Sequence, residues 1–329
     1  MRKQAKYWVG FDLGATKMLG LVFDSEFRVV GEKRRKTKAG GGGAENGVSR
    51  IIETVEQTLA ECGVPGESLL GIGVAVPGPL DLNKGVLLES PNMGWKNLPL
   101  KRILEKRYPC PTVISNDVDA GVYGEYSFGA ARGARCAIGV FPGTGIGGGC
   151  IYEGRIIRGK TGSCFEIGHC QVQPDGPLCG CGQRGCLEAL ASRLAIAAAA
   201  ATAIYRGDAP HLAQEVGTDL SQIRSSSLAR AISAGDQSIR SILEEAARWI
   251  GIGVANAIQL LAPDVVLLGG GLVEAMPDLF LQEVTRTARS RVMPTYRNSF
   301  RVVTARLGDH ATATGAAAWA RENGPKSRK

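Results

Sequence analysis

The feature that most constrains the fold is a strand–glycine turn–strand pattern that occurs twice. Residues 7–23 contain two apolar strand patterns separated by a turn, Gly14-Ala15-Thr16-Lys17. Roughly 130 residues later, residues 134–152 repeat the pattern around a second turn, Pro142-Gly143-Thr144-Gly145. A hairpin that recurs at this distance predicts two related lobes, each with a glycine turn at the same place.

The other segments contain both strand and helix patterns, and the fold class expected for the chain is α/β. Further buried strands are predicted at residues 70–76, 112–115 and 264–268. Helical periodicity predicts the longer helices at residues 46–62, 118–128, 187–205, 238–261 and 312–322. A chain of 329 residues is long enough for two domains, each with its own core.

Both glycine turns have the composition of phosphate-binding loops. Glycine lets backbone N–H groups approach an anion closely, and Thr16 and Thr144 each add a hydroxyl donor. Neither turn is a P-loop, because Gly-Lys-Ser/Thr is missing at the required spacing. Two such turns predict a nucleotide held between the lobes. A third glycine run either approaches the same nucleotide or is a simple strand-to-helix turn: Gly269-Gly270-Gly271.

Asn116 and Asp117 follow the strand pattern of residues 112–115. A carboxylate at this place can accept a proton from a substrate hydroxyl, while the amide hydrogen-bonds a neighbouring hydroxyl. That pairing is what a sugar phosphotransferase needs. An Asn-Asp pair also occurs as a turn or a helix cap, and on these two residues alone both interpretations stay open.

The strongest local signal is a cluster of residues that commonly bind metal ions. His169 stands ten residues before Cys179, and Cys181 and Cys186 follow. One imidazole and three thiolates complete a tetrahedral set for Zn²⁺ with no position left for water, which predicts a structural ion. These cysteines stand too close in sequence for mutual disulfides of normal geometry. If His169 binds the ion through one ring nitrogen, its other N–H can serve a substrate hydroxyl or a carboxylate.

Composition argues against several classes of protein. The side chains are 44% hydrophobic and 21% charged, which is ordinary for a globular protein. No apolar run approaches the ~20 residues of a membrane span, and no signal-peptide pattern precedes the first strand, so we expect a cytoplasmic protein without a membrane partner. The net charge is +8, but the basic residues are spread out, which favours a solvated basic surface over a nucleic-acid partner.

Six motifs, taken in the order of the chain, resemble those of the ROK family of repressors, open-reading-frame proteins and sugar kinases. The resemblance extends across nearly the whole chain. The matching motifs are Asp12-x-Gly14-x-Thr16-Lys17, Pro77-Gly78-Pro79, Asn116-Asp117, Gly143-Thr144-Gly145-x-Gly147-Gly148, Glu166-x-Gly168-His169 and Cys179-Gly180-Cys181-Gly182-x-x-Gly185-Cys186-x-Glu188. Within the family, the chain is most similar to bacterial glucokinases through Pro91-Asn92-Met93-x-Trp95 and Pro174-Asp175-Gly176-Pro177-Leu178-Cys179.

The resemblance implies the two-lobed actin-like ATPase fold of sugar kinases, hsp70 and actin, with duplicated ribonuclease-H-like domains. We therefore expect a small lobe of residues 1–117 plus about 305–329, to which the C-terminal helix returns. The larger lobe is expected at residues 118–304. The resemblance also implies a homodimer or a homotetramer that binds a small-molecule sugar and ATP.

Roles for individual residues are implied in the same way. Asp117 is expected to be the base that acts on the 6-hydroxyl of the sugar, and Asp12 to face the Mg²⁺ that accompanies ATP. The remaining sugar hydroxyls are expected at Gly78, Asn116, Glu166, His169 and Glu188. ATP is expected at the three glycine turns, through Gly14, Thr16, Lys17, Thr144, Gly145, Gly269, Gly270 and Gly271.

One departure from the family pattern bears on the sugar. Family glucokinases usually have small residues, often Ala-Gly, just before the Glu-x-Gly-His motif, whereas this chain has Ser163-Cys164-Phe165. A phenylalanine next to the sugar would reshape the pocket. Glucose is expected first, and fructose, mannose, allose or an N-acetylhexosamine remain alternatives.

Two other functions are alternatives to a sugar kinase that uses ATP. A sugar-responsive repressor carries a helix-turn-helix domain ahead of the first hairpin, and only a few residues precede Tyr7 here. A kinase that uses polyphosphate would need a dedicated basic loop, which the sequence does not suggest. The sequence therefore favours the ATP-dependent sugar kinase.

Overall fold

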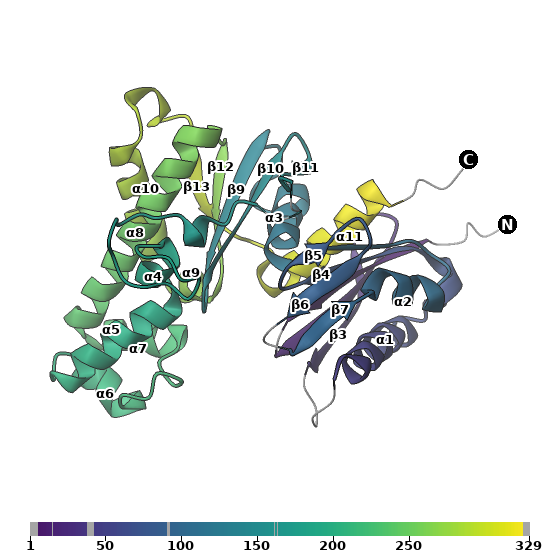
Figure 1. Cartoon of the computed structure of the whole chain (residues 1–329), viewed down its shortest axis with the longest axis horizontal. Helices are drawn as coiled ribbons and strands as arrows, with labels where there is room; N and C mark the ends of the chain where they lie inside the picture. The colour runs from purple at the N-terminus through teal and green to yellow at the C-terminus, as the bar shows by residue number, and fades with distance from the viewer. Residues whose placement is uncertain are drawn as a thin grey trace. The chain divides into compact units, whose positions relative to one another are not determined.

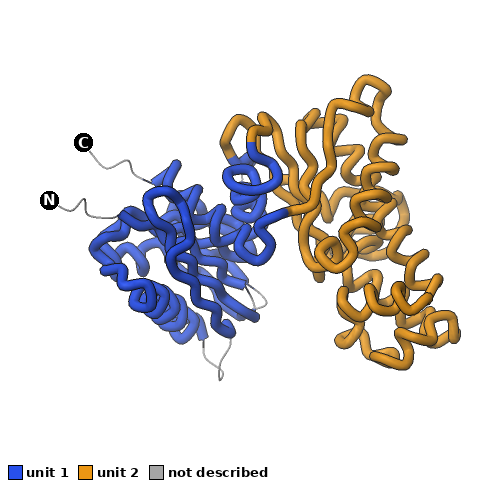
Figure 2. The backbone as a smooth tube through the Cα atoms, turned by 180° about the vertical axis from the view of Figure 1, so that it is seen from behind, with its two compact units in different colours: residues 1–132, 156–164, 306–329 blue, residues 133–155, 165–305 orange. Residues whose placement is uncertain are grey.

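The computed structural model describes residues 6–14, 16–37, 43–90, 93–160, 162 and 164–324. The chain forms two compact units (Figure 2). Unit 1 comprises Met1–Arg132, Ile156–Cys164 and Arg306–Lys329, and unit 2 comprises Gly133–Arg155 and Phe165–Ala305. Both ends of the chain therefore belong to unit 1.

Unit 1 is built on a five-stranded sheet in the order β3-β2-β1-β4-β8. Its strands are β1 (Tyr7–Leu13), β2 (Lys17–Phe23), β3 (Val29–Lys36), β4 (Leu69–Val76) and β8 (Thr112–Asn116). The first three pair antiparallel, whereas β1, β4 and β8 run parallel, so their carboxyl ends lie at one edge. A small antiparallel sheet follows β4, with strands β5 (Leu80–Asp81), β6 (Val86–Ser90) and β7 (Trp95–Leu98).

Helices cover both faces of this sheet (Figure 1). On one face lie α1 (Ala44–Glu61) and α2 (Leu100–Arg107), and on the other lie α3 (Asp117–Phe128) and α11 (Ala311–Asn323). The apolar periodicity of α1 places its buried side against an apolar core that includes the fully buried residues Phe11, Leu13, Ile51, Ile72 and Leu104.

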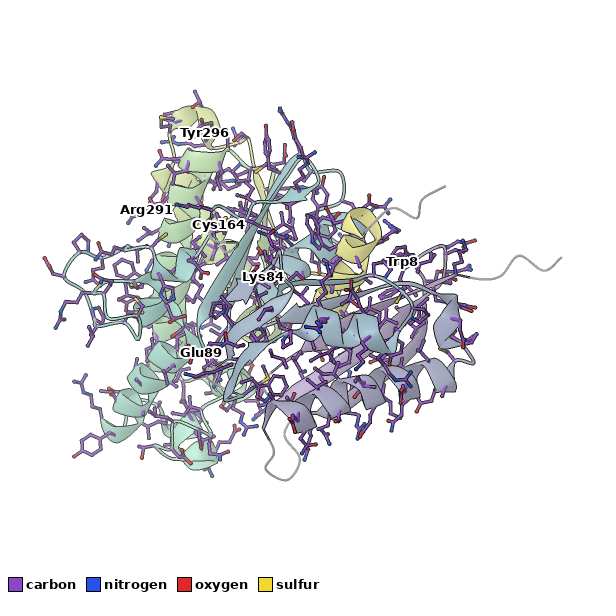
Figure 3. All side chains as sticks on the ribbon, turned by 45° about the vertical axis from the view of Figure 1, so that its right-hand side comes forward. Trp8, Lys84, Glu89, Cys164, Arg291 and Tyr296 are labelled. Carbon is purple, nitrogen blue, oxygen red and sulfur yellow. The ribbon has the colours of Figure 1, made fainter. Side chains whose placement is uncertain are left out.

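Glycines in the strands of unit 1 let neighbouring groups approach closely. A Cβ atom at Gly10 of β1 would lie 1.9 Å from the carbonyl oxygen of Ala313 in α11, so the helix could not pack against a larger residue there. A Cβ at Gly71 of β4 would lie 2.7 Å from the ring of Trp8, whose side chain is labelled in Figure 3. Gly10 therefore sets the distance between the sheet and α11, and Gly71 leaves room for the Trp8 ring of the neighbouring strand β1.

Unit 2 repeats the strand order of unit 1. Its sheet has the order β11-β10-β9-β12-β13. Strand β10 pairs antiparallel with β9, and β12 and β13 are parallel neighbours on the other side of β9. The strands are β9 (Cys136–Pro142), β10 (Ile146–Tyr152), β11 (Arg155–Ile156), β12 (Val265–Leu268) and β13 (Arg301–Thr304). The repeated hairpin predicted from the sequence is confirmed as part of a repeated sheet.

Most helices of the described chain belong to unit 2. They are α4 (Leu187–Ala191), α5 (Arg193–Tyr205), α6 (Pro210–Val216), α7 (Ser225–Ala234), α8 (Gln237–Leu261), α9 (Gly271–Ala275) and α10 (Pro277–Arg291). Short 3₁₀ helices occur in both units: η1 (Gly66–Ser68), η2 (Ile167–His169), η3 (Pro294–Tyr296) and η4 (Gly308–His310). The long helix α8 packs against α4, α5 and α10, and 11 of its 25 residues are buried.

The helix expected at residues 187–205 is interrupted. Ser192 has extended backbone angles, and its hydroxyl oxygen accepts a hydrogen bond from the N–H of Ala195 at 3.3 Å, so it ends α4 and caps α5. Contrary to the expectation from the sequence, the stretch Leu187–Tyr205 is long and apolar enough to cross a membrane, by length and composition only. Only 39% of it is buried, but core helices of soluble proteins meet the same criterion.

The boundary between the units differs from the one expected at Asp117. All of α3 belongs to unit 1 because it packs along α11, and residues 156–164 belong there too. The buried Glu125 of α3 accepts hydrogen bonds from the backbone N–H groups of Arg306 at 2.7 Å and Leu307 at 2.6 Å. These bonds tie α3 to the segment that leads into α11.

Candidate functional site

The first glycine turn joins β1 to β2 at the edge of the unit 1 sheet. The N–H of Gly14 donates to the carbonyl oxygen of Lys17 at 3.0 Å, which closes the turn. At the end of β3, the hydroxyl of Thr37 donates to the Gly14 carbonyl at 2.6 Å, and its N–H donates to the Thr16 carbonyl at 2.9 Å. The turn is thus held from outside, while the side chains of Thr16 and Lys17 are exposed.

A carboxylate next to this turn pairs with two cations. The ammonium of Lys17 lies 3.2 Å from a carboxylate oxygen of Asp309, which the guanidinium of Arg34 also contacts. Together with Asp12, these three side chains line a small pocket. No motif in the sequence pointed to Arg34 and Asp309, because they come from β3 and η4, outside every motif.

Asp12 lies beside this charged group, at the carboxyl end of β1. Burial raises its pKa from 3.8 to about 7, and the negative charge of Asp117 adds to the effect. Two carboxylates that repel one another offer the oxygen ligands that Mg²⁺ prefers. The residues therefore fit the expected Mg²⁺ site.

Asn116 and Asp117 stand where β8 ends and α3 begins. The side-chain oxygen of Asn116 caps α3, since it accepts hydrogen bonds from the N–H groups of Val118 at 2.9 Å and Asp119 at 3.2 Å. The helix-cap interpretation is therefore correct for the side-chain oxygen of Asn116. The NH₂ group of the same amide is the part suited to donate a hydrogen bond to the expected sugar hydroxyl. Parallel pairing of β1, β4 and β8 brings Asp12, Gly78 and this pair to the same edge of the sheet.

Gly78 follows β4 in a conformation that requires glycine. Its φ is +107°, and a Cβ would lie 2.4 Å from the carbonyl oxygen of Glu89. The turn therefore approaches β6 closely and leaves its own backbone groups at the edge that carries Asp117. Pro91 and Asn92 of the glucokinase-like motif lie outside the described residues.

The second glycine turn joins β9 to β10 in unit 2. It closes through a hydrogen bond from the N–H of Gly143 to the carbonyl of Gly145 at 2.8 Å. Arg193 donates from its backbone N–H to the Gly143 carbonyl at 2.8 Å and from Nη2 to the hydroxyl oxygen of Thr144 at 2.7 Å. The side chain of Thr144 is exposed, so its hydroxyl is accessible to a ligand.

Glu188 supports the same turn from α4. One carboxylate oxygen, Oε2, accepts a hydrogen bond from the N–H of Ile146 at 2.8 Å, and the other, Oε1, lies 3.9 Å from the Sγ atom of Cys179. A Cβ at Gly145 would lie 2.3 Å from the carboxylate. Glu188 therefore contacts both the glycine turn and the cysteine cluster, in addition to the sugar role expected for it.

The third glycine run follows β12, which is the parallel neighbour of β9. Gly270 has a φ of +83°, and a Cβ there would lie 2.8 Å from the carbonyl oxygen of Pro142. The run therefore lies against the start of the second glycine turn. Next to it is a pocket of about 700 Å³, which is lined by Arg193, Ser221, Arg224, Ser225, Ser226, Gly271, Glu274 and Ala275.

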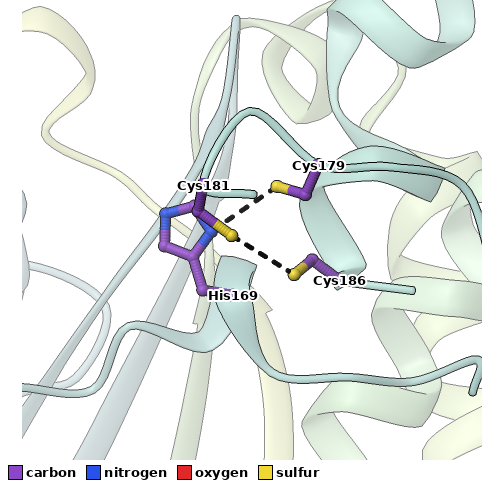
Figure 4. Close-up of side chains that lie close together, drawn as sticks. All are labelled: His169, Cys179, Cys181 and Cys186. Carbon is purple, nitrogen blue, oxygen red and sulfur yellow. Dashed lines mark hydrogen bonds between the residues drawn. The ribbon is translucent and has the colours of Figure 1, made fainter. Parts of the chain in front are cut away.

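His169, Cys179, Cys181 and Cys186 form one cluster (Figure 4). Their ligand atoms all lie within 4.8 Å of one another. The Sγ atoms of Cys181 and Cys186 are 3.7 Å apart, and Sγ of Cys179 is 3.7 Å from Nδ1 of His169. Tetrahedral Zn²⁺ with bonds of ~2.3 Å to sulfur would place two sulfur ligands about 3.8 Å apart, so these residues fit the ion. Nδ1 faces the thiols, which leaves Nε2 as the nitrogen for a second partner.

The segment before this cluster has an unusual backbone. Phe165 has a φ of +60°, a conformation that is rare for a bulky residue and easy for glycine. A Cβ at Gly148 of β10 would lie 2.9 Å from the Phe165 ring, so the ring lies against this strand. The strained residue immediately precedes Glu166, whose carbonyl accepts a hydrogen bond from the N–H of His169 at 2.9 Å.

The expected site residues therefore fall into two sets. Unit 1 holds Asp12, Gly14, Thr16, Lys17, Gly78, Asn116 and Asp117, which gather at one edge of its sheet. Unit 2 holds Thr144, Gly145, Glu166, His169, Cys179, Cys181, Cys186, Glu188, Gly269, Gly270 and Gly271. Arg193 joins the second set, and no motif in the sequence pointed to it.

Known proteins resemble the chain over nearly its whole length. Residues 8–323 match the model of the ROK family. A glucokinase of Streptomyces coelicolor is 32% identical over 96% of this chain and 98% of its own. A xylose repressor of Bacillus spizizenii is 27% identical over 95% of this chain and 76% of its own.

A solved structure agrees with these relatives. The ROK family glucokinase of Streptomyces griseus, solved in complex with glucose and AMPPNP, has a TM-score of 0.80 and 32% identity, and the match covers 97% of this chain and all of that one (100%). The actin-like ATPase fold expected from the motifs is confirmed by this neighbour and by the repeated sheet. The protein therefore belongs to the ROK family.

Proposed function

We propose that the protein transfers the γ-phosphoryl group of ATP to the 6-hydroxyl of a hexose, with glucose as the preferred sugar. The observation that carries the proposal is the position of Asp117 in unit 1. It follows the last parallel strand at the sheet edge that also holds Asp12 and the first glycine turn. A carboxylate beside a phosphate-type turn is the arrangement that phosphoryl transfer to a hydroxyl requires.

In the proposed reaction, Asp117 accepts the proton of the 6-hydroxyl. The sugar oxygen forms a bond to the γ-phosphorus while the bond from that phosphorus to the bridging oxygen of ADP breaks. Backbone N–H groups and hydroxyls of the glycine turns stabilise the charge on the phosphoryl oxygens. When bound, Mg²⁺ supplies further charge neutralisation, and Asp12 is the carboxylate suited to hold it near ATP.

The other sugar hydroxyls are assigned to the residues that the family motifs name. The NH₂ group of Asn116 is suited to donate, because its oxygen is used by α3. In unit 2, Glu166, Glu188 and Nε2 of His169 supply acceptors and a donor, and Gly78 contributes backbone groups from unit 1. Zn²⁺ would be structural: it would hold the segment that carries His169 against the segment that leads to Glu188.

The identity of the sugar rests on weaker support than the reaction class. The glucokinase relatives favour glucose. The strained Phe165 beside Glu166 favours the second candidate, a kinase of another hexose or of an N-acetylhexosamine. A sugar-responsive regulator is a further candidate, because a xylose repressor is also a relative. We also propose a cytoplasmic homodimer or homotetramer that binds neither nucleic acid nor membrane.

The test is a coupled assay of ADP release with ATP and Mg²⁺ against a panel of sugars. The panel contains glucose, mannose, fructose, allose, N-acetylglucosamine and N-acetylmannosamine. We expect the highest kcat/KM with glucose, about tenfold above that of the next sugar. Differences of this size in kcat/KM are typical when single contacts in a pocket distinguish similar substrates. A higher kcat/KM for another sugar would assign the protein to the second candidate. If calorimetry detects sugar binding but no sugar releases ADP, the kinase assignment is wrong.

A further inference from the structure

Arg193 opens α5 and contacts the second glycine turn in two ways. Its backbone N–H donates to the carbonyl of Gly143 at 2.8 Å, and its Nη2 donates to the hydroxyl oxygen of Thr144 at 2.7 Å. The first bond shapes the turn and is independent of the side chain. The second acts on the hydroxyl group that is expected to meet a phosphate.

The direction of the second bond decides what Thr144 can do. A hydroxyl has one hydrogen and two acceptor lone pairs, and a guanidinium can only donate. Arg193 therefore occupies a lone pair of the hydroxyl oxygen and leaves the O–H to donate to another group. A charged donor on the oxygen also polarises the O–H bond and strengthens its donation. The acceptor that gains most from such a hydroxyl is an anionic oxygen.

The charge of Arg193 is not taken up by a carboxylate. Across the part of the chain that the structure describes, no ion pair involves Arg193, whereas Lys17 at the first turn pairs with Asp309. Arg193 also lines the pocket of about 700 Å³ next to the third glycine run. The guanidinium thus contacts the turn and borders a space large enough for part of a nucleotide.

We propose that Arg193 is a positioning residue for the phosphoryl donor. It holds the hydroxyl of Thr144 with its hydrogen directed at a phosphate oxygen of a nucleoside triphosphate. The proposal rests on the proposed function, in which this turn binds ATP. Arg193 acts through Thr144 and need not touch the donor itself.

The first experiment measures ADP release for Arg193→Gln and Arg193→Lys. ATP is varied at a saturating sugar concentration, and the sugar is then varied at a saturating ATP concentration. We expect Arg193→Gln to raise KM for ATP about tenfold and to change KM for the sugar less than about twofold, because one charge-supported hydrogen bond is lost. Arg193→Lys should recover most of the loss, since an ammonium also only donates. Both variants keep the backbone bond to Gly143, so the turn stays anchored.

A double-mutant cycle tests whether Arg193 acts through Thr144. Thr144→Val alone should raise KM for ATP about tenfold, and the double variant should be no worse than either single one. Independent effects would instead multiply to about a hundredfold. The matched control is Arg206→Gln at the other end of α5, which removes the same charge away from the turn and should leave both KM values within about twofold.

Two outcomes would overturn the proposal: an unchanged KM for ATP in Arg193→Gln, or multiplied effects in the double variant. Failure of the proposed function is distinguishable, because the wild-type protein would then release no ADP with any sugar. In that case, calorimetry measures the binding of a non-hydrolysable ATP analogue to the two variants and tests the role of Arg193 without catalysis. Weaker binding to Arg193→Gln than to Arg206→Gln supports the role of Arg193, and equal binding refutes it.

Discussion

The two units share one strand order, but side chains of opposite charge contact their glycine turns. In unit 1, the carboxylate of Asp309 binds Lys17, the cation of the first turn. In unit 2, the guanidinium of Arg193 binds Thr144, the hydroxyl of the second turn. The first turn thus presents a cation that is already paired, and the second presents a hydroxyl supported by a cation. The repeated sheet determines where the turns lie. The side chains that contact them, Asp309 in unit 1 and Arg193 in unit 2, determine which charged or polar group each turn presents.

The units also differ in what fixes their other site residues. In unit 1, Gly78 and Asp117 follow parallel strands that the sheet and α11 already hold. In unit 2, Glu166 and His169 lie in a short 3₁₀ helix and its entry, and the cysteine cluster links this segment to the start of α4. The comparison teaches that in unit 2 a cluster of side chains that fits a metal ion holds the site segment, whereas in unit 1 parallel strands hold the site residues.

For the comparison of how the two units hold their site residues, the largest effect is expected from breaking the cysteine cluster of unit 2. Cys181→Ser removes one of four ligands, and we expect loss of bound Zn²⁺, a fall in activity of more than about 100-fold and a lower Tm, because binding energy of the ion is folding energy. Metal analysis, the ADP-release assay and thermal unfolding measure these three changes together. A metal-free variant with full activity would contradict the structural role of the ion.

Cys170→Ser is the matched control for this prediction. Cys170 directly follows His169 and is exposed, but it is not part of the cluster. This variant should keep its zinc and its activity within about twofold, since an exposed substitution outside the cluster changes little.

A smaller effect, confined to unit 1, is expected from Asp12→Asn. The pKa of Asp12 is raised from 3.8 to about 7, so the folded protein keeps a proton that the unfolded chain releases. Ionisation of Asp12 therefore lowers the free energy of unfolding, and this loss grows as the pH rises from about 4 to 7. Asparagine is neutral throughout. Without Mg²⁺, we expect the variant to gain about 2–8 °C in Tm at pH 8 and less at pH 5.

Thermal unfolding across this pH range checks the prediction. The control is Asp24→Asn, because the N–H of Arg28 lowers the pKa of Asp24 and the variant should not gain stability at pH 8. A gain of Asp12→Asn that is equal at both pH values would show that its cause is not the ionisation of Asp12.

Contacts close in sequence were predictable, and contacts between distant segments were not. The spacing of Cys179, Cys181 and Cys186 predicted the cluster, since few residues separate them. The pairs Lys17–Asp309 and Thr144–Arg193 join residues that only the fold brings together. The break at Ser192 was also not predictable, because the apolar periodicity continues on both sides of this residue. The hydroxyl that caps α5 does not change that periodicity.

The most direct test of the central claim is the turnover of Asp117→Asn with ATP and the best sugar. The amide cannot accept the hydroxyl proton, so kcat should fall about 10²–10⁴-fold, while the Kd of the sugar measured by calorimetry changes less than about threefold. Turnover like that of the wild-type protein would contradict the assignment of Asp117 as the base.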